Sequence, residues 1–216
     1  MRSFPYLRIG MSSIKPKFML KVGITGGIGS GKTTVCKIFE QLGIPVYYAD
    51  ERAKHLMVQD AEVIQQLKHL FGEQTYLADG QLNRAHLASI VFQDKKKLAQ
   101  LNNIVHPAVY RDGDKWHSQQ LGKPYTLKEA ALLFEGEGHK YLDKIITVFA
   151  PKALRIDRVM QRDEVAREAV EARIANQLPD IDKLNKADYI IINNGQQPLL
   201  PQVLSIHRQL VQLSTM

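Results

Sequence analysis

The sequence predicts an α/β fold, with a five-stranded parallel sheet flanked by helices. Short apolar runs rich in β-branched residues alternate along the chain with segments whose apolar residues have helical spacing. The chain has 216 residues, of which 44% are hydrophobic, so it can bury a substantial core. Strands that alternate with helices pair in parallel, and ligands of such sheets bind at the carboxyl ends of the strands.

The first expected elements surround a glycine-rich segment. Residues 19–25 form a short apolar run that ends in glycines and predicts a buried strand. Residues 32–42 have apolar side chains at helical spacing, and Gly43 follows as a natural helix stop. A second strand is expected over residues 44–49, with Pro45 at its start, where a missing N–H is tolerated.

The middle of the chain has a different pattern. Residues 51–120 are mostly helical in pattern without a strong strand signal, so they predict a helical insertion. Strands are expected again at residues 126–134 and 144–150. Residues 152–187 are charged and helical, and a fifth strand at residues 189–193 precedes a final helix. The expected nucleotide-binding core therefore combines three segments, which are residues 19–50, 121–151 and 188–216.

The net charge of +7 raises the question of a nucleic-acid partner. Residues 1–18 contribute +4 from two arginines and two lysines without an acid, which leaves +3 (7 − 4) for the rest. A modestly basic body suits a small anionic substrate at least as well as DNA or RNA, and we expect no nucleic-acid partner. Residues 1–18 are expected to be a disordered leader. Alternatively, translation starts later than Met1, at Met11 or Met19.

Cysteine content and hydropathy bear on the location of the protein. Cys36 is the single cysteine, so no internal disulfide can form, and a reducing compartment such as the cytoplasm is expected. No apolar run approaches the roughly 20 residues of a membrane-spanning helix, and we expect no membrane partner. The sequence leaves the oligomeric state open between a monomer and a weak oligomer.

The strongest motif lies between the first expected strand and the first expected helix. Residues 26–33 match the phosphate-binding P-loop pattern G-x-x-x-x-G-K-[ST] in the strand–loop–helix context that this motif requires. Its glycines let backbone N–H groups, aided by the helix dipole, reach phosphate oxygens. Lys32 supplies positive charge for the β- and γ-phosphates of ATP, and the Thr33 hydroxyl is a ligand for the accompanying Mg²⁺. The residues expected to contact the nucleotide are Gly27, Ile28, Gly29, Ser30, Gly31, Lys32, Thr33, Thr34 and, at the end of the fifth strand, Asn193.

A GTP-binding protein is an alternative, because residues 185–188 spell N-K-x-D, a guanine-recognition pattern. In GTPases that motif follows a strand, whereas here it precedes the strand expected at residues 189–193. The polar residues of this segment are more typical of the capping or solvation of a helix end. We therefore favour ATP as the nucleotide.

Asp50 ends the second expected strand, which in such sheets lies beside the strand that leads into the P-loop. Phosphoryl transfer to an alcohol needs a carboxylate that takes the proton of the acceptor, and Asp50 can point at the γ-phosphate. An aspartate at a strand-to-helix junction is also a common helix N-cap. Position alone leaves both roles open.

Arginines are concentrated after the fourth expected strand. Arg155, Arg158 and Arg162 lie at i, i+3 and i+7, and hence on one face of a helix. Interleaved acidic residues make a solvated, self-paired helix one interpretation. Arginines that close over ATP stabilise charge in the transition state, so residues 152–187 are also expected to form a lid that excludes water.

Together these residues resemble the dephospho-CoA kinase family from Met19 to about Gly195. The ordered set of motifs is more specific than the P-loop alone. It comprises residues 23–34, Ala49-Asp50, Asp79-Gly80, Arg84, Leu87, Val91-Phe92, Leu101-Asn102, His106-Pro107, Leu132-Leu133-Phe134-Glu135, Arg158, Arg162-Asp163, Arg173, Gln177, Ala187-Asp188-Tyr189 and Asn193. The resemblance implies a kinase that uses ATP to phosphorylate the ribose 3′-hydroxyl of dephospho-CoA, which gives CoA and ADP in the final step of coenzyme A biosynthesis.

The resemblance also implies roles for individual residues. Asp50 is then the general base, and Lys32, Arg158 and Arg162 act on the transferred phosphoryl group. The insertion at 51–120 is then the CoA-binding domain. The residues expected on the acceptor side are Thr25, Asp50, Arg84, His106 and Glu135.

The chain departs from the family pattern at a few positions. Tyr48 replaces the first aspartate of the usual Asp-Ala-Asp, Lys54 stands where an arginine is usual, and Ala131 replaces a common proline. None of these changes removes a group that the chemistry requires. Two other hypotheses for the function stay open. The first is another small-molecule or nucleotide kinase of the same architecture, and the second is a non-catalytic protein that binds nucleotides or nucleic acid.

Overall fold

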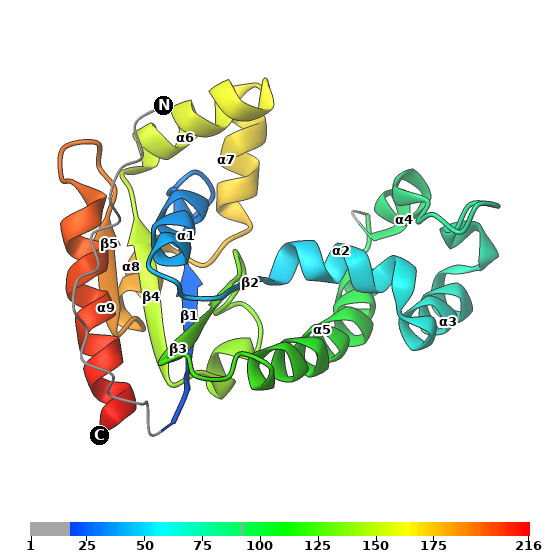
Figure 1. Ribbon diagram of the computed structural model, residues 1–216. Coiled ribbons are helices and arrows are strands. Elements are labelled where there is room, and N and C mark those ends of the chain that lie inside the picture. The colour runs from blue at the N-terminus through cyan, green and yellow to red at the C-terminus, as the bar shows by residue number, and fades with distance from the viewer. Residues whose placement is uncertain (1–17, 92) are drawn as a thin grey trace, which may run out of the picture.

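The computed structural model describes residues 18–91 and 93–216, and the leader expected at residues 1–18 lies outside this range except for Phe18. A five-stranded parallel sheet has the order β2-β3-β1-β4-β5 (Figure 1). The expected α/β class is thus confirmed, but β3 lies between β2 and β1, so the expectation that the strand before Asp50 lies beside the P-loop strand is wrong. The strands are β1 (Leu20–Thr25), β2 (Val46–Tyr48), β3 (Tyr125–Glu129), β4 (Lys144–Phe149) and β5 (Tyr189–Ile192).

The main core lies on the face of the sheet that is covered by α1 (Lys32–Gln41) and α9 (Leu199–Thr215). Side chains alternate between the faces of a strand, so alternate apolar residues of β1, β3 and β4 point to these two helices. Phe39 of α1 and Tyr125 of β3 meet edge to face, with ring centroids 6.3 Å apart. This packing fixes the helix that begins at the P-loop.

The opposite face of the sheet is covered by α5 (Lys95–Ser118) and the short helix α8 (Asp180–Asn185). His117 of α5 is hydrogen-bonded to Thr126 of β3 at 2.8 Å. Thr147 of β4 donates to the carbonyl of Lys183 in α8 at 3.3 Å. The sheet therefore has helices on both faces, as a parallel sheet requires.

The helical insertion has an apolar core of its own. It is formed by buried side chains such as Val63, Leu67 and Leu87, and it shares no buried residue with the sheet core. In Figure 1 the insertion projects away from the sheet beyond β2. Its helices are α2 (Ala49–Gln59), α3 (Ala61–Phe71), α4 (Arg84–Val91) and α5, with a 3₁₀ turn at Glu73–Thr75.

Two helices beyond β4 pack against the P-loop. They are α6 (Lys152–Asp163) and α7 (Arg167–Ala175), and Ile156, Val159 and Val170 bury a small apolar cluster with Ile28 of the loop at its edge. The turn between the helices begins at Glu164, which adopts a left-handed conformation with φ of 54°.

The third strand is shorter than its apolar pattern predicts. The strand expected over residues 126–134 ends at Glu129, and the chain then turns, with a 3₁₀ turn at Gly138–Tyr141 before β4. The expected strand end at residue 134 is therefore wrong, and Glu135 does not directly follow a strand. Leu133 and Phe134 are buried in a separate cluster with Ile145, so apolarity there reflects a packed turn rather than a strand.

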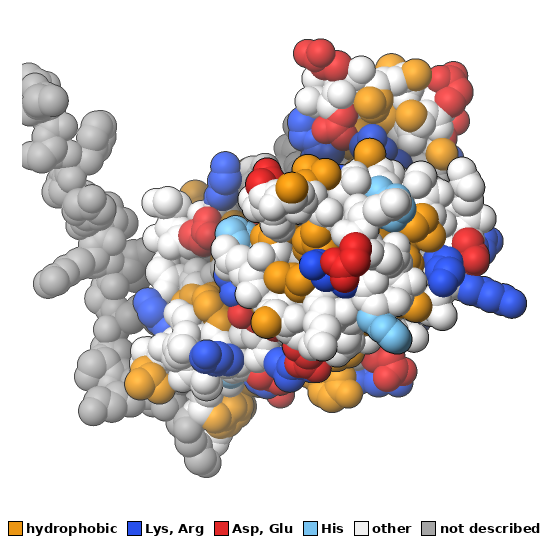
Figure 2. All heavy atoms as spheres, turned by 90° about the vertical axis from the view of Figure 1, so that its right-hand side faces the viewer, with side chains coloured by type: hydrophobic (Ala, Val, Ile, Leu, Met, Phe, Trp, Pro, Cys, Tyr) orange, Lys and Arg blue, Asp and Glu red, His pale blue; other side chains and the backbone are white. Residues whose placement is uncertain are grey.

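Within the part of the chain that the structure describes, no helix has the length and apolar character needed to cross a membrane. Figure 2 shows the face on which the insertion lies. Lysine and arginine side chains are interspersed there with acidic ones rather than gathered into one continuous patch.

We expect stability to fall below about pH 6.5 because of His207. This α9 side chain is buried and hydrogen-bonded to the Tyr125 hydroxyl at 2.8 Å. Burial, with a smaller contribution from Arg208, lowers the pKa of His207. The unfolded histidine therefore binds its proton first, and stability present above about pH 6.5 is lost as pH falls toward the lower folded pKa.

Thermal unfolding at about pH 7.5 and about pH 5.5 checks this expectation. The decrease in Tm between these conditions should be smaller for His207→Gln than for the unaltered protein. His69→Gln, at an exposed position of α3, is the matched control and should leave the decrease unchanged. An equal decrease in the His207 variant would contradict the prediction.

Candidate functional site

The P-loop connects β1 to α1 and presents the open N-terminus of that helix. Gly31 is the N-cap residue, with φ of 91°, and no side chain caps the helix. Gly29 also has a positive φ of 78°, which other residues rarely adopt. Free N–H groups and the helix dipole therefore face the solvent-accessible side, where they can bind an anion.

A cavity of about 990 Å³ lies at this helix terminus, and we call it the nucleotide cavity. It brings together most of the residues that the sequence predicts for phosphate binding and transfer. Of these it does not include Gly27, Ser30 and Asn193. The predicted residues that line it are Ile28, Gly29, Gly31, Lys32, Thr33, Thr34, Asp50, Arg158 and Arg162.

Lys32 lies inside the nucleotide cavity, and its ammonium donates to the carbonyl of Gly26 at 3.0 Å. Burial lowers the pKa of Lys32, while the nearby carboxylates of Glu129 and Asp50 act in the opposite direction. The charged form of a buried lysine is favoured by such acidic neighbours. Lys32 thus lies within electrostatic range of both the Glu129 and the Asp50 carboxylates.

Glu129 is a site residue that the sequence analysis missed. It is the last residue of β3, only 8% exposed, and it lines the nucleotide cavity. Burial raises the pKa of Glu129 and the Lys32 charge opposes that effect. An acidic residue within the apolar run is the available signal, but the apolar pattern predicts a strand that continues to residue 134.

Asp50 lies in the first turn of α2 rather than at its N-cap. The N-cap is Tyr48, and no side-chain hydrogen bond caps this helix, so the N-cap role for Asp50 is wrong. Asp50 is exposed, and it lines both the nucleotide cavity and a second, neighbouring cavity. Its carboxylate is therefore accessible from both spaces.

The second cavity, which we call the acceptor cavity, has a volume of about 270 Å³ and lies between α2, α5 and the chain after β3. Its lining is mostly apolar, with Asp50, His106 and Lys128 as the titratable side chains apart from Tyr110. Burial is the main cause that lowers the pKa of His106, and the Lys128 charge adds to it. A neutral His106 is thereby favoured.

Arg158 and Asn193 connect α6 to the P-loop. Asn193 donates to the carbonyl of Ser30 at 2.8 Å, and Arg158 reaches Asn193 Oδ1 and the carbonyl of Gly29 at 3.4 Å each. Arg162 lines the same cavity but forms a two-pronged pair with Asp163, which also accepts from Arg173. The interpretation of a self-paired helix therefore fits Arg162 but not Arg158.

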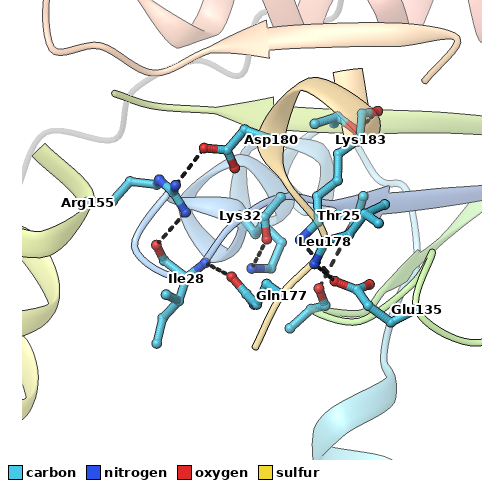
Figure 3. A network of polar contacts seen from close by, with 12 residues as sticks. Thr25, Ile28, Lys32, Glu135, Arg155, Gln177, Leu178, Asp180 and Lys183 are labelled. Atoms are coloured by element: carbon cyan, nitrogen blue, oxygen red, sulfur yellow. Dashed lines mark hydrogen bonds and ion pairs between the residues drawn. The ribbon is translucent and has the colours of Figure 1, made fainter. Parts of the chain in front are cut away.

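Arg155 of α6 and Gln177, which follows α7, contact the P-loop, as Figure 3 shows. The buried Arg155 guanidinium pairs with Asp180 at 2.6 Å and lies so close to Gly27 that a side chain there would collide with it. Gln177 Oε1 accepts from the N–H of Ile28 at 2.9 Å. These contacts between distant parts of the chain have no local sequence signal.

Three residues expected on the acceptor side line neither cavity. Thr25 is buried, with its hydroxyl 3.5 Å from the carbonyl of Ala131. Glu135 accepts from the N–H of Leu178 at 2.8 Å and lies 3.2 Å from the buried Lys183 ammonium (Figure 3). Arg84 is exposed at the start of α4.

The N-K-x-D segment does not form part of the nucleotide cavity. Its Asp188 carboxylate accepts from the N–H of Ile145 and pairs with Lys144, so it lies at the amino end of β4. The P-loop follows the carboxyl end of β1. Because β1 and β4 are parallel, Asp188 and the P-loop lie at opposite ends of the strands. This geometry disfavours the GTP-binding alternative.

Three features define the class of P-loop kinases. They are a parallel sheet, a P-loop that opens α1, and an acidic residue, Glu129, at the end of β3 beside β1. A shikimate kinase from Acinetobacter baumannii, 17% identical with a TM-score of 0.50, shares the fold over 91% of this chain and 96% of its own. The family model for dephospho-CoA kinase matches residues 20–198. The chain belongs to the dephospho-CoA kinase family, and it is an ATP-dependent kinase of coenzyme A biosynthesis.

Individual relatives agree with this membership. The dephospho-CoA kinase of Bacteroides fragilis strain YCH46 is 37% identical over 87% of this chain and 91% of its own length. That of Salinibacter ruber is 41% identical over 82% of this chain and 90% of its own. TT1252 from Thermus thermophilus, a solved structure, is 35% identical with a TM-score of 0.79 and covers 89% of this chain and 98% of its own.

Proposed function

We propose that this protein transfers the γ-phosphoryl group of ATP to the ribose 3′-hydroxyl of dephospho-CoA, and that Asp50 is the general base. The observation that supports this most directly is that Asp50 lines both the nucleotide and the acceptor cavities. A hydroxyl entering from the acceptor cavity then meets the carboxylate and the γ-phosphate in the same place. The single buried Cys36 supports a reducing compartment such as the cytoplasm.

In this mechanism the P-loop N–H groups and Lys32 bind the β- and γ-phosphates. Asp50 accepts the proton of the acceptor hydroxyl as its oxygen attacks the γ-phosphorus, and ADP leaves with the bond electrons. Arg158, already beside Gly29 of the loop, stabilises the charge that develops on the transferred group. Arg162 adds to this when its guanidinium turns from Asp163 toward the cavity.

The residues present fit magnesium as the accompanying cation. The Thr33 hydroxyl and the Glu129 carboxylate both line the nucleotide cavity, and oxygen donors of this kind suit Mg²⁺, which takes its other ligands from water and phosphate. We infer that these two residues hold the ion, Glu129 directly or through a water. When bound, Mg²⁺ neutralises charge on the β- and γ-phosphate oxygens.

The test of the function is a rate measurement with purified protein, Mg-ATP and dephospho-CoA. ADP formation with dephospho-CoA, and far less with adenosine or nucleoside monophosphates, is the expected result. Preference for a nucleoside monophosphate would favour a different kinase of the same architecture. Absence of ADP formation with every acceptor would favour the non-catalytic alternative.

Glu129→Gln is expected to lower activity by about 10- to 100-fold at limiting Mg²⁺, the usual effect of losing a group that supports a metal site. The neutral amide keeps the volume of the side chain but removes the charge beside Lys32. More Mg²⁺ should therefore be needed for half-maximal rate, which a magnesium titration at fixed ATP measures. Tm should not fall, since the variant removes a buried charge.

Glu40→Gln is the matched control for Glu129→Gln. Glu40 also lines the nucleotide cavity, but it is exposed and hydrogen-bonded to the Tyr48 hydroxyl at 3.1 Å. The magnesium dependence of this control should equal that of the unaltered protein. The same dependence in both variants would remove Glu129 from the proposed metal site.

A further inference from the structure

The wall of the acceptor cavity contains one lysine, Lys128, among mostly apolar side chains. It comes from β3, on the face covered by α5, and it is partly buried. The alternation of the strand explains its direction, because the next residue, Glu129, points to the nucleotide cavity instead. Adjacent residues of one strand thus place a cation in one cavity and a carboxylate in the other.

The ammonium group of Lys128 has no hydrogen bond or ion pair with any residue that the structure describes. It lies over the ring of Tyr110 at 4.7 Å and near the ring of Tyr47 at 5.9 Å. The neighbouring acid, Asp114, is already paired with Lys21 at 2.6 Å. Aromatic faces compensate only part of the cost of removing a charge from water, so this cation is poised for an anionic partner.

Lys128 and Asp50 belong to the same cavity, with His106 within electrostatic range of both. Asp50 and Lys128 shift the pKa of His106 in opposite directions. Tyr110, over which the ammonium lies, also lines this cavity. A ligand whose hydroxyl reaches Asp50 can therefore extend toward Lys128 without leaving the cavity.

We propose that Lys128 is a specificity-determining residue that binds the 5′-diphosphate of the acceptor, an inference that rests on the proposed function. The ribose whose hydroxyl is phosphorylated also bears this diphosphate, so one sugar separates the two groups. Asp50 then recognises the hydroxyl and Lys128 the anion. A charged hydrogen bond in a partly desolvated wall is strong enough to discriminate acceptors with a diphosphate from those without it.

The competing interpretation is that Lys128 only packs α5 against β3 through the two tyrosine rings. Lys128→Met distinguishes the anion-binding role from the packing role, because methionine keeps an apolar chain over the rings and removes the charge. We expect the KM for dephospho-CoA to rise about 10- to 100-fold, which corresponds to the loss of a hydrogen bond to a charged group. The KM for ATP and kcat should stay within about threefold of the unaltered values, since Lys128 does not line the nucleotide cavity.

Lys128→Arg should restore most of the affinity, and Lys115→Met, at an exposed lysine of α5, should leave both KM values unchanged. Added salt should raise the KM for dephospho-CoA in the unaltered protein more than in Lys128→Met. An unchanged KM for dephospho-CoA, or a joint loss of kcat, both KM values and Tm, would overturn the proposal. If Lys128→Met does not fold, the proposal is tested by the KM for dephospho-CoA of Lys128→Arg and by the salt dependence of that KM in the unaltered protein. Failure of the unaltered protein to use dephospho-CoA would instead refute the proposed function.

Discussion

Asp50→Asn is expected to lower kcat by about 10²–10⁴-fold, the usual contribution of a positioned general base, and to leave the KM for ATP nearly unchanged. Asparagine keeps the shape of the side chain but does not take up the acceptor proton. The P-loop, which binds the phosphates of ATP, is not altered by this change. Steady-state rates with each substrate varied in turn measure both parameters.

Glu51→Gln is the matched control for Asp50→Asn. Glu51 is the next residue of α2, lines the same nucleotide cavity and pairs with Lys54 at 2.7 Å. Both carboxylates lie in the first turn of α2, so the loss of either charge changes the helix-dipole energy by a similar small amount, about 0.3–1 kcal/mol. A near-normal kcat in the asparagine variant would exclude Asp50 as the base.

Lys32→Ala is expected to reduce kcat by at least about 10²–10³-fold and also to raise the KM for ATP. The magnitude is that of losing one preorganised electrostatic contact in an active site. Both parameters change because the ammonium binds the phosphates before the reaction and stabilises them during it. Removal also leaves Glu129 and Asp50 without the cation that offsets their mutual repulsion.

Lys37→Ala provides the comparison for Lys32→Ala. Lys37 lies in α1, lines the nucleotide cavity and is exposed, so this variant removes the same charge from the same cavity. Its kcat should remain close to that of the unaltered protein. Equal losses in the two variants would mean that the cavity requires only net positive charge and not a lysine at the P-loop position.

The parts of the site that depend on local sequence were predictable. The P-loop pattern determines its own turn and the helix that follows, and strand–helix alternation predicts the parallel sheet. Asp50 was a candidate from its place in the chain, and His106 from the family resemblance; each lines the acceptor cavity. The P-loop and Asp50 signals need only a few neighbouring residues.

The parts that depend on tertiary packing were not predictable. The end of β3 at Glu129 could not be located, because the apolar run continues into buried turn residues such as Leu133 and Phe134. The contacts of Arg155 with Asp180 and of Gln177 with Ile28 join segments far apart in the chain. Helical spacing placed Arg155 beside Arg158 on one face, yet burial separates the environments of the two side chains.

The separate apolar cores of the sheet and the insertion affect how the enzyme can change over evolution. The acceptor cavity is lined mainly by α2, α5 and the chain after β3, whereas the nucleotide cavity is lined by the P-loop, α1, α6 and the start of α2. Substitutions that repack the insertion can therefore alter the width of the acceptor cavity while the sheet core that supports the P-loop stays intact. On the proposed function, substitutions in α5 can change acceptor selectivity alone, whereas substitutions at the start of α2, which lines both cavities, affect ATP use as well.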